Sequence, residues 1–160
     1  MAQLRAALGD AGFGDVATYV QSGNVVLTSH DSVAKVALAV ERLIEKEFGL
    51  RVPVVVRTRA EIAEVVKRNP LAKVAENPKR YQVSFLEKEP TAELIRKLEA
   101  VAAPTERVVA HGREIYAWHP EGVARSRLWA LLAGKQLGTT ATARNWTTVT
   151  NLLALADGSA

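Results

Sequence analysis

The chain has 160 residues, 48% apolar and 24% charged, which is the balance of an ordinary globular protein and excludes a disordered chain. It contains no cysteine, which excludes disulfides, thiolate catalysis and thiolate-bound zinc or iron–sulfur sites. The net charge of +4 is a mild excess rather than the basic stripe of a nucleic-acid binder. The absence of cysteine favours a reducing cytoplasm. Because the apolar runs are short, we expect no signal peptide and no membrane span.

The first part of the sequence predicts an alternation of helices and strands. In chain order these are a helix over residues 1–12, hairpin strands over 16–20 and 25–28, a helix over 33–48 and a strand over 51–57. The long helix has apolar residues on one face, begins after Asp31 or Ser32 and ends at Gly49. Pro53 indicates that the strand over 51–57 has one unpaired edge at that point.

The remaining elements follow from capping residues and β-prone runs. Thr58 and Glu61 form a capping box that starts a helix, and the pair Asn69 and Pro70 ends it. The rest are a strand over 81–86, a helix capped by Thr91, a hairpin of strands 107–110 and 114–118, a helix capped by Ser126 and a last helix from near Asn145.

This order of elements predicts an α+β protein built from two ferredoxin-like (split βαβ) halves, with antiparallel sheets covered by helices. Residues 80–157 hold a β-α-β-β-α unit, and residues 1–68 hold the same unit without its first strand. We predict one domain over residues 1–160, with the duplication resting on element order alone.

Three polar segments are candidate ligand sites. The first is the hairpin tip of Gln21, Ser22, Gly23 and Asn24. One interpretation is a simple turn, in which Gly23 adopts a positive φ and Asn24 hydrogen-bonds to the local backbone. The other is a ligand-binding loop, in which backbone amides and two amide side chains face a ligand.

The other two candidates place an arginine at a helix start. Arg144, Asn145 and Trp146 lie in a threonine-rich stretch, where Asn145 suits an N-cap and Trp146 an anchor, while Arg144 suits an anion site. Arg125 and Ser126 repeat the pattern, as a serine cap beside a solvated arginine or as part of an anion pocket. If the two arginines converge in space, the anion pocket is favoured.

Known enzyme and metal motifs match poorly. The sequence has no Gly-x-Ser-x-Gly elbow, no Walker loop and no Gly-x-Gly-x-x-Gly fingerprint. His30, His111 and His119 lack ligand spacing, so we expect no metal and no cofactor. His119 beside Ser126 is a weak candidate for acid–base work. The strand aromatics are a weak candidate for stacking nucleic-acid bases and otherwise belong to the core; they are Tyr81, Phe85, Tyr116 and Trp118.

Several of these motifs in combination resemble one family, the domain-of-unknown-function 1697 family of bacterial proteins. The likeness runs from residue 1 to about Leu155 and is carried by residues 18–26, Arg57, Thr58, Asn69, Pro70, Tyr116, Pro120, Gly122, Arg125, Ser126, Thr142, Arg144, Asn145 and Trp146. The resemblance implies a duplicated ferredoxin-like fold and no established activity. It adds Arg57 and Tyr116 to the candidate ligand-binding residues.

Family members usually begin with a strand and a glycine-rich loop, whereas this chain starts inside the first helix of that pattern. We therefore expect a misassigned or truncated start. The alternatives are direct pairing of strands 25–28 and 52–57, or a strand donated by another chain.

The sequence favours a binding module for a small anionic ligand or nucleotide, with no membrane partner. The alternatives are a nucleic-acid-binding module, which would use the sheet aromatics and the basic excess of residues 67–80, and an enzyme of unidentified activity.

Overall fold

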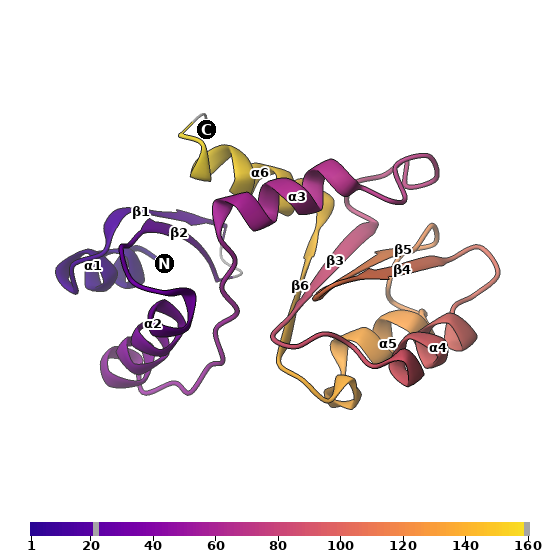
Figure 1. The fold of residues 1–160 in the computed structure, drawn as a ribbon, viewed down its shortest axis with the longest axis horizontal. Helices are drawn as coiled ribbons and strands as arrows, with labels where there is room; N and C mark the ends of the chain where they lie inside the picture. Colours follow the sequence, from indigo (N-terminus) through magenta and orange to yellow (C-terminus); the bar gives the residue numbers. More distant parts are fainter. Residues whose placement is uncertain (21–22, 159–160) are drawn as a thin grey trace. The chain divides into compact units, whose positions relative to one another are not determined.

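The fold was analysed in a computed structural model that describes residues 1–20 and 23–158 (Figure 1). The chain divides into two compact units. Unit 1 consists of residues 1–63 and 151–160, and unit 2 of residues 64–150. The divisions fall inside α3 (Arg59–Arg68) and α6 (Trp146–Ala156), so each of these helices contributes to both units.

Unit 1 contains α1 (Ala2–Asp10), α2 (Val33–Phe48) and an antiparallel pair, β1 (Gly14–Tyr19) and β2 (Asn24–Thr28). Its core is formed by Leu8, Val36 and Val40. The predicted ends of α2 are confirmed: the Ser32 hydroxyl accepts from the amide of Lys35, and Gly49 adopts the left-handed conformation with φ of 66°.

The strand predicted over residues 51–57 is wrong. Within the described residues this segment is irregular and enters no β-ladder, so it does not pair with β2. The amide of Val54 donates instead to the Glu41 carboxylate on α2, at 2.9 Å. The apolar side chains of Val54 and Val56 pack on the core of unit 1. These β-branched side chains are therefore partly buried in the core of unit 1, although their segment has no strand partner.

A capping box starts α3, as predicted. The Glu61 carboxylate accepts from the amide of Thr58 at 2.8 Å, and the Thr58 hydroxyl accepts from the amide of Glu61 at 3.2 Å. The helix ends at Arg68, and the next residue, Asn69, takes a positive φ of 33° before Pro70.

Unit 2 is built on a four-stranded sheet with the order β4-β5-β3-β6, in which every neighbouring pair is antiparallel. Its elements are β3 (Tyr81–Leu86), α4 (Ala92–Val101), β4 (Arg107–His111), β5 (Glu114–Trp118), α5 (Arg127–Ala133), a 3-10 turn (Lys135–Leu137) and β6 (Ala141–Asn145). One face of the sheet packs on α4 and α5. The buried cluster there comprises Leu86, Leu94, Leu98, Ile115, Ala117, Leu128, Leu131, Leu132 and Leu137.

Strand β6 was absent from the sequence prediction, which treated residues 139–148 as the polar entry to a helix. The strand pairs with β3 from Ala141 opposite Leu86 to Asn145 opposite Gln82. Threonine is a good strand former, but this segment has no long apolar run, so the sequence pattern did not indicate a strand. Strand β6 completes a β-α-β-β-α-β unit.

The predicted class is confirmed as α+β with antiparallel sheets. The duplication of two ferredoxin-like halves stays a prediction, because the described part of unit 1 contains a two-stranded sheet. Among the described residues, no helix combines the length and apolarity needed to cross a membrane.

The cap of α4 allows a first prediction. The Thr91 hydroxyl accepts from the amide of Leu94 at 3.1 Å. Thr91→Ala removes this acceptor and should lower the free energy of unfolding by about 1 kcal/mol, measured by urea denaturation. Thr91→Ser keeps the hydroxyl and should stay close to the wild type. Equal losses in both variants would contradict the capping role.

Candidate functional site

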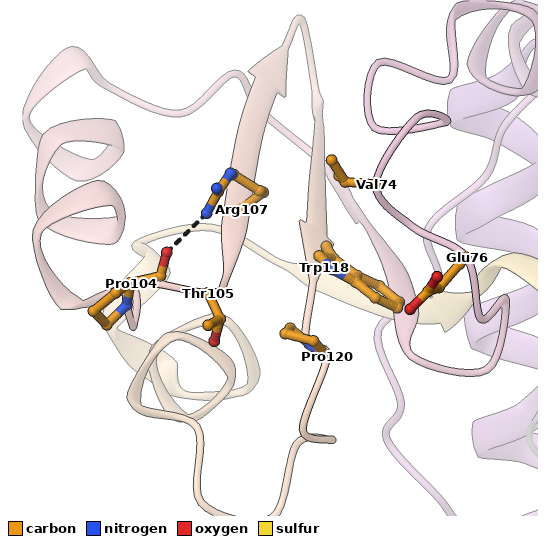
Figure 2. A pocket seen from close by; sticks show the side chains of 7 residues that line it. All are labelled: Val74, Glu76, Pro104, Thr105, Arg107, Trp118 and Pro120. Atoms are coloured by element: carbon orange, nitrogen blue, oxygen red, sulfur yellow. Dashed lines mark hydrogen bonds between the residues drawn. The ribbon is translucent and has the colours of Figure 1, made fainter.

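A hollow of about 360 Å³ lies in unit 2 (Figure 2). It is lined by Val74, Glu76, Pro104, Thr105, Arg107, Trp118 and Pro120. Arg107 and Trp118 are register partners on β4 and β5 and therefore share one face of the sheet. Val74 and Glu76 come from the segment between α3 and β3. We refer to this hollow as the Arg107 pocket; its volume falls within the range of small-molecule sites.

The Arg107 side chain is held by backbone carbonyls through one of its nitrogens. Its Nη1 donates to the Pro104 carbonyl at 2.9 Å and to the Glu106 carbonyl at 2.8 Å. Its Nε and Nη2 have no hydrogen-bond partner among the described residues. These two nitrogens form the fork that binds a carboxylate or phosphate in bidentate fashion. The guanidinium is thus oriented without using its anion-binding edge.

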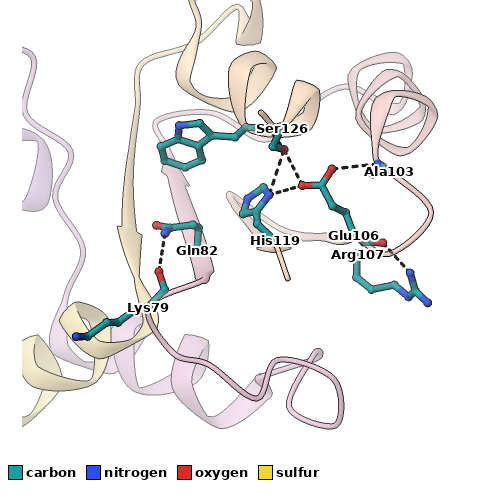
Figure 3. A network of polar contacts seen from close by, with 8 residues as sticks. Lys79, Gln82, Ala103, Glu106, Arg107, His119 and Ser126 are labelled. Carbon is teal, nitrogen blue, oxygen red and sulfur yellow. Dashed lines mark hydrogen bonds and ion pairs between the residues drawn. The ribbon is translucent and has the colours of Figure 1, made fainter. Parts of the chain in front are cut away.

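A buried polar cluster of Glu106, His119 and Ser126 lies where β4 begins and β5 ends (Figure 3). The Glu106 Oε2 is 2.5 Å from His119 Nδ1 and accepts from the Ser126 hydroxyl at 2.6 Å, while Oε1 accepts from the Ala103 amide at 3.0 Å. Burial raises the pKa of Glu106, but the hydrogen bonds from Ser126, Ala103 and His119 outweigh it and lower the pKa below its usual value.

This cluster does not have the geometry of a serine–histidine relay. Such a relay places the hydroxyl and the carboxylate on opposite ring nitrogens. Here Ser126 Oγ lies 3.3 Å from Nδ1, the nitrogen that already faces Glu106, and it also accepts from the amide of Trp129 as the cap of α5. The other nitrogen, Nε2, is buried with no hydrogen-bond partner in the described residues. The cluster therefore ties β4, β5 and α5 together.

Sequence reasoning missed Glu106. It is a single glutamate in the loop before β4, and its partners lie 13 and 20 residues further along the chain. No local spacing signals such a contact, because the loops that end two strands bring it about. Within the described part of the chain, no three histidine, aspartate or glutamate side chains gather as a metal site would require.

Two of the candidate ligand-binding residues of unit 1, Gln21 and Ser22, lie outside the described residues. Gly23 has a positive φ of 78°, and the buried Asn24 donates its amide to the Tyr19 carbonyl at 3.1 Å. Both observations fit a hairpin turn. Arg57 is half-buried and donates to its neighbour's carbonyl, that of Val56, at 3.2 Å.

The arginine–asparagine–tryptophan motif is largely structural. Asn145 accepts from the amide of Thr148 at 2.9 Å and caps α6. Trp146 stacks on Tyr81, with ring centroids 4.8 Å apart and planes 18° apart. The Arg144 guanidinium is half-buried and donates to the Thr142 hydroxyl and, at 2.8 Å, to the Ala143 carbonyl. Burial lowers the pKa of Arg144 below its usual value.

The two arginine-bearing segments belong to opposite sides of the sheet in unit 2. Arg144 is the register partner of Val83, which in turn faces Tyr116 on the same side. Ser126 begins α5, which packs on the other side against Ile115. The start of α5 beside Arg125 and the strand position of Arg144 therefore belong to opposite faces of the sheet, because alternate strand residues point to opposite faces, and the condition that would favour a shared anion pocket is not met by these elements.

The strand aromatics are buried, as the core interpretation expected. Tyr81, Phe85, Tyr116 and Trp118 are each at most 5% exposed. The Tyr116 hydroxyl donates to the Val65 carbonyl at 3.0 Å, and burial raises its pKa. Rings in this position offer no open face on which a base can stack. The part of the nucleic-acid hypothesis that rests on them is wrong for this fold.

Residues 1–20 and 23–158 thus form an α+β protein with two antiparallel sheets and a small polar pocket beside a buried glutamate–histidine pair. The chain belongs to the family described as "protein of unknown function (DUF1697)", whose pattern matches residues 1–116. No curated protein matches the sequence. The conserved bacterial protein SP0830 from Streptococcus pneumoniae has a similar structure: the TM-score is 0.78, with 21% identity over 98% of this chain and 88% of that one. At this identity the likeness shows the fold alone.

Proposed function

We propose that the protein is a cytoplasmic binding module for a small anionic ligand, which it holds in the Arg107 pocket. The observation that carries the proposal is the Arg107 guanidinium, which is anchored through Nη1 while its Nε and Nη2 fork has no partner among the described residues. An oriented guanidinium binds a carboxylate or phosphate with less loss of side-chain entropy than a free one. The absence of cysteine fits a reducing compartment.

The other side chains that line the pocket fit a ligand that has a small apolar group beside its anionic group. Pro104 and Pro120 supply apolar surface, the nearly buried Trp118 contributes only an exposed edge, and Thr105 supplies a donor or acceptor. Arg125 and Arg144 are not among the residues that line this pocket, and their role in ligand binding stays a prediction. The same holds for the hairpin tip at Gly23 and Asn24.

A nucleic-acid-binding role is the second candidate, and one observation favours it. Four basic side chains are exposed at the end of α3 and in the segment between α3 and β3. They are those of Lys67, Lys73, Lys79 and Arg80. Such residues contact phosphates without reading sequence.

Titration with benzoate, inorganic phosphate and adenosine monophosphate tests the small-ligand proposal. The readout is the amide and indole NMR signals of the ¹⁵N-labelled protein. We expect saturable shifts centred on Arg107 and Trp118, lost in Arg107→Ala and at least partly lost in Arg107→Lys, which keeps the charge without the fork. Arg96→Ala changes an exposed arginine on α4 and serves as the control.

Absence of any shift with all three anions would contradict the small-ligand proposal. Binding of a short single-stranded RNA that weakens steeply with salt and depends on Lys79 and Arg80 would favour the second candidate instead.

A further inference from the structure

Strand β4 is an edge strand, and the anchored guanidinium of Arg107 lies where the strand begins. The sheet order β4-β5-β3-β6 leaves one side of β4 without a strand partner in the described part of the chain. Figure 2 shows the Arg107 guanidinium on that side, next to Pro104 and away from β5. The proposed anion site therefore lies at one end of an open sheet edge.

Two residues of β4 direct their backbone groups toward this open edge. A two-residue turn joins β4 to β5, so His111 beside the turn forms a hydrogen-bonded pair with its partner on β5. An antiparallel ladder uses the backbone groups of every second residue, here Arg107, Val109 and His111. Those of Val108 and Ala110 therefore point away from β5, and they have no backbone partner among the described residues.

An extended peptide can add to such an edge as a further strand. Natural proteins usually protect a free edge with proline, lysine or a bulge, whereas β4 contains neither residue and pairs with β5 in an unbroken register. A peptide antiparallel to β4 ends where β4 begins, so its terminal carboxylate meets the Nε and Nη2 fork of Arg107. Its last side chain then lies at the Arg107 pocket, against Val74, Pro104 and Pro120.

We propose that β4 binds the C-terminal segment of a partner protein as an added antiparallel strand, with Arg107 holding the terminal carboxylate. This inference rests on the proposed anion site and names the source of the anion, a chain terminus with an apolar last residue. Main-chain hydrogen bonds along β4 supply affinity, and the carboxylate fixes the register and direction of the peptide. A free metabolite would use the fork alone.

Four probes separate the carboxylate from the strand. The reference is acetyl-Ser-Thr-Val-Thr-Val with a free C-terminus. The others are its C-terminal amide, the same acid N-methylated at both threonines, which lie opposite Val108 and Ala110, and N-acetyl-L-valine, which has the carboxylate without the strand. Dissociation constants come from the amide NMR signals of the ¹⁵N-labelled protein. We expect the reference peptide to bind at least about tenfold more tightly than each of the other three.

Amide hydrogen exchange reports on the added strand directly. With the reference peptide bound, the amides of Val108 and Ala110 should exchange at least about tenfold more slowly, because each gains an acceptor. The amide of Val109 is already paired with β5 and is the internal control. An anion bound in the pocket alone would leave all three exchange rates unchanged.

Variants separate the same two contributions. Arg107→Ala should bind the reference peptide and its C-terminal amide equally weakly, while Arg96→Ala on α4 should keep the tenfold preference for the acid. Ala110→Pro removes one outward N–H and should weaken the reference peptide about tenfold, since an edge strand accepts proline where the N–H is unpaired. Thermal unfolding checks its fold, and the N-methylated peptide tests the same bonds on the wild type.

A reference peptide that binds no more tightly than N-acetyl-L-valine, with unchanged exchange at Val108 and Ala110, would overturn the inference and leave the anion site standing. Failure of every probe, together with failure of benzoate and phosphate, would remove the anion site as well. Equal binding of the acid and its amide by the wild type would overturn the inference, because the terminus would then not be recognised. Protection of the two amides that rises with protein concentration, without peptide, would assign the edge to a second copy of the chain and overturn it too.

Discussion

Replacement of Glu106 by alanine is expected to lower the free energy of unfolding by about 3 kcal/mol or more, because removing one partner of a buried polar cluster leaves the others unpaired. Glu106 is 8% exposed, and His119, which it contacts, is fully buried. Its loss also frees the Ser126 hydroxyl and the Ala103 amide. Urea denaturation followed by circular dichroism measures the change.

Glu106→Gln is the matched control, since the amide oxygen keeps one acceptor without the charge. It should destabilise less than the alanine variant. A loss below 1 kcal/mol in Glu106→Ala would contradict the structural role of the cluster, because a single unsatisfied buried group already costs about that much.

The same carboxylate makes stability depend on pH. The pKa of Glu106 in the folded protein lies below its ordinary value of 4.5. A group with a lowered pKa stabilises the fold above the unfolded pKa, and this contribution is lost as pH falls from the unfolded to the folded value. Wild-type stability should therefore fall below pH 4.5, and Glu106→Gln should lack this component.

Replacement of Trp146 by alanine is expected to cost about 3 kcal/mol, in the lower part of the range for removal of a large aromatic from a core. The indole stacks on the buried Tyr81 ring. Tyr81 also donates its hydroxyl to Asn69 at 3.0 Å, so the stack links β3, α6 and the end of α3. Thermal and urea unfolding of the variant measure the effect.

Trp146→Phe keeps a stacking ring and should recover most of the lost stability. The structural role also predicts that Trp146→Ala, at a temperature where it remains folded, binds ligands of the Arg107 pocket like the wild type. A stable variant that loses binding would reverse the assignment and return Trp146 to the candidate ligand site.

The candidate site shows where sequence reasoning reaches its limit. Ser126 and Asn145 were recognised as helix caps, and both act as caps. Arg107 was not singled out, because nothing beside it in the sequence marks the guanidinium as anchored. Its orientation depends on the carbonyls of Pro104 and Glu106, and the pocket around it needs residues 74–76 brought beside β5.

The features that could be predicted from the sequence have local causes, apart from the overall α+β class: they are the amphipathic face of α2, the cap at Thr91 and the capping box of Thr58 and Glu61. Three others depend on the packing of the folded chain: the pairing of β6 with β3, the irregular course of residues 51–57, and the contact of Glu106 with His119. Helix caps act within four residues, so the sequence displays them directly. Strand pairing and buried polar contacts join residues far apart, and their energies depend on partners that no local pattern identifies.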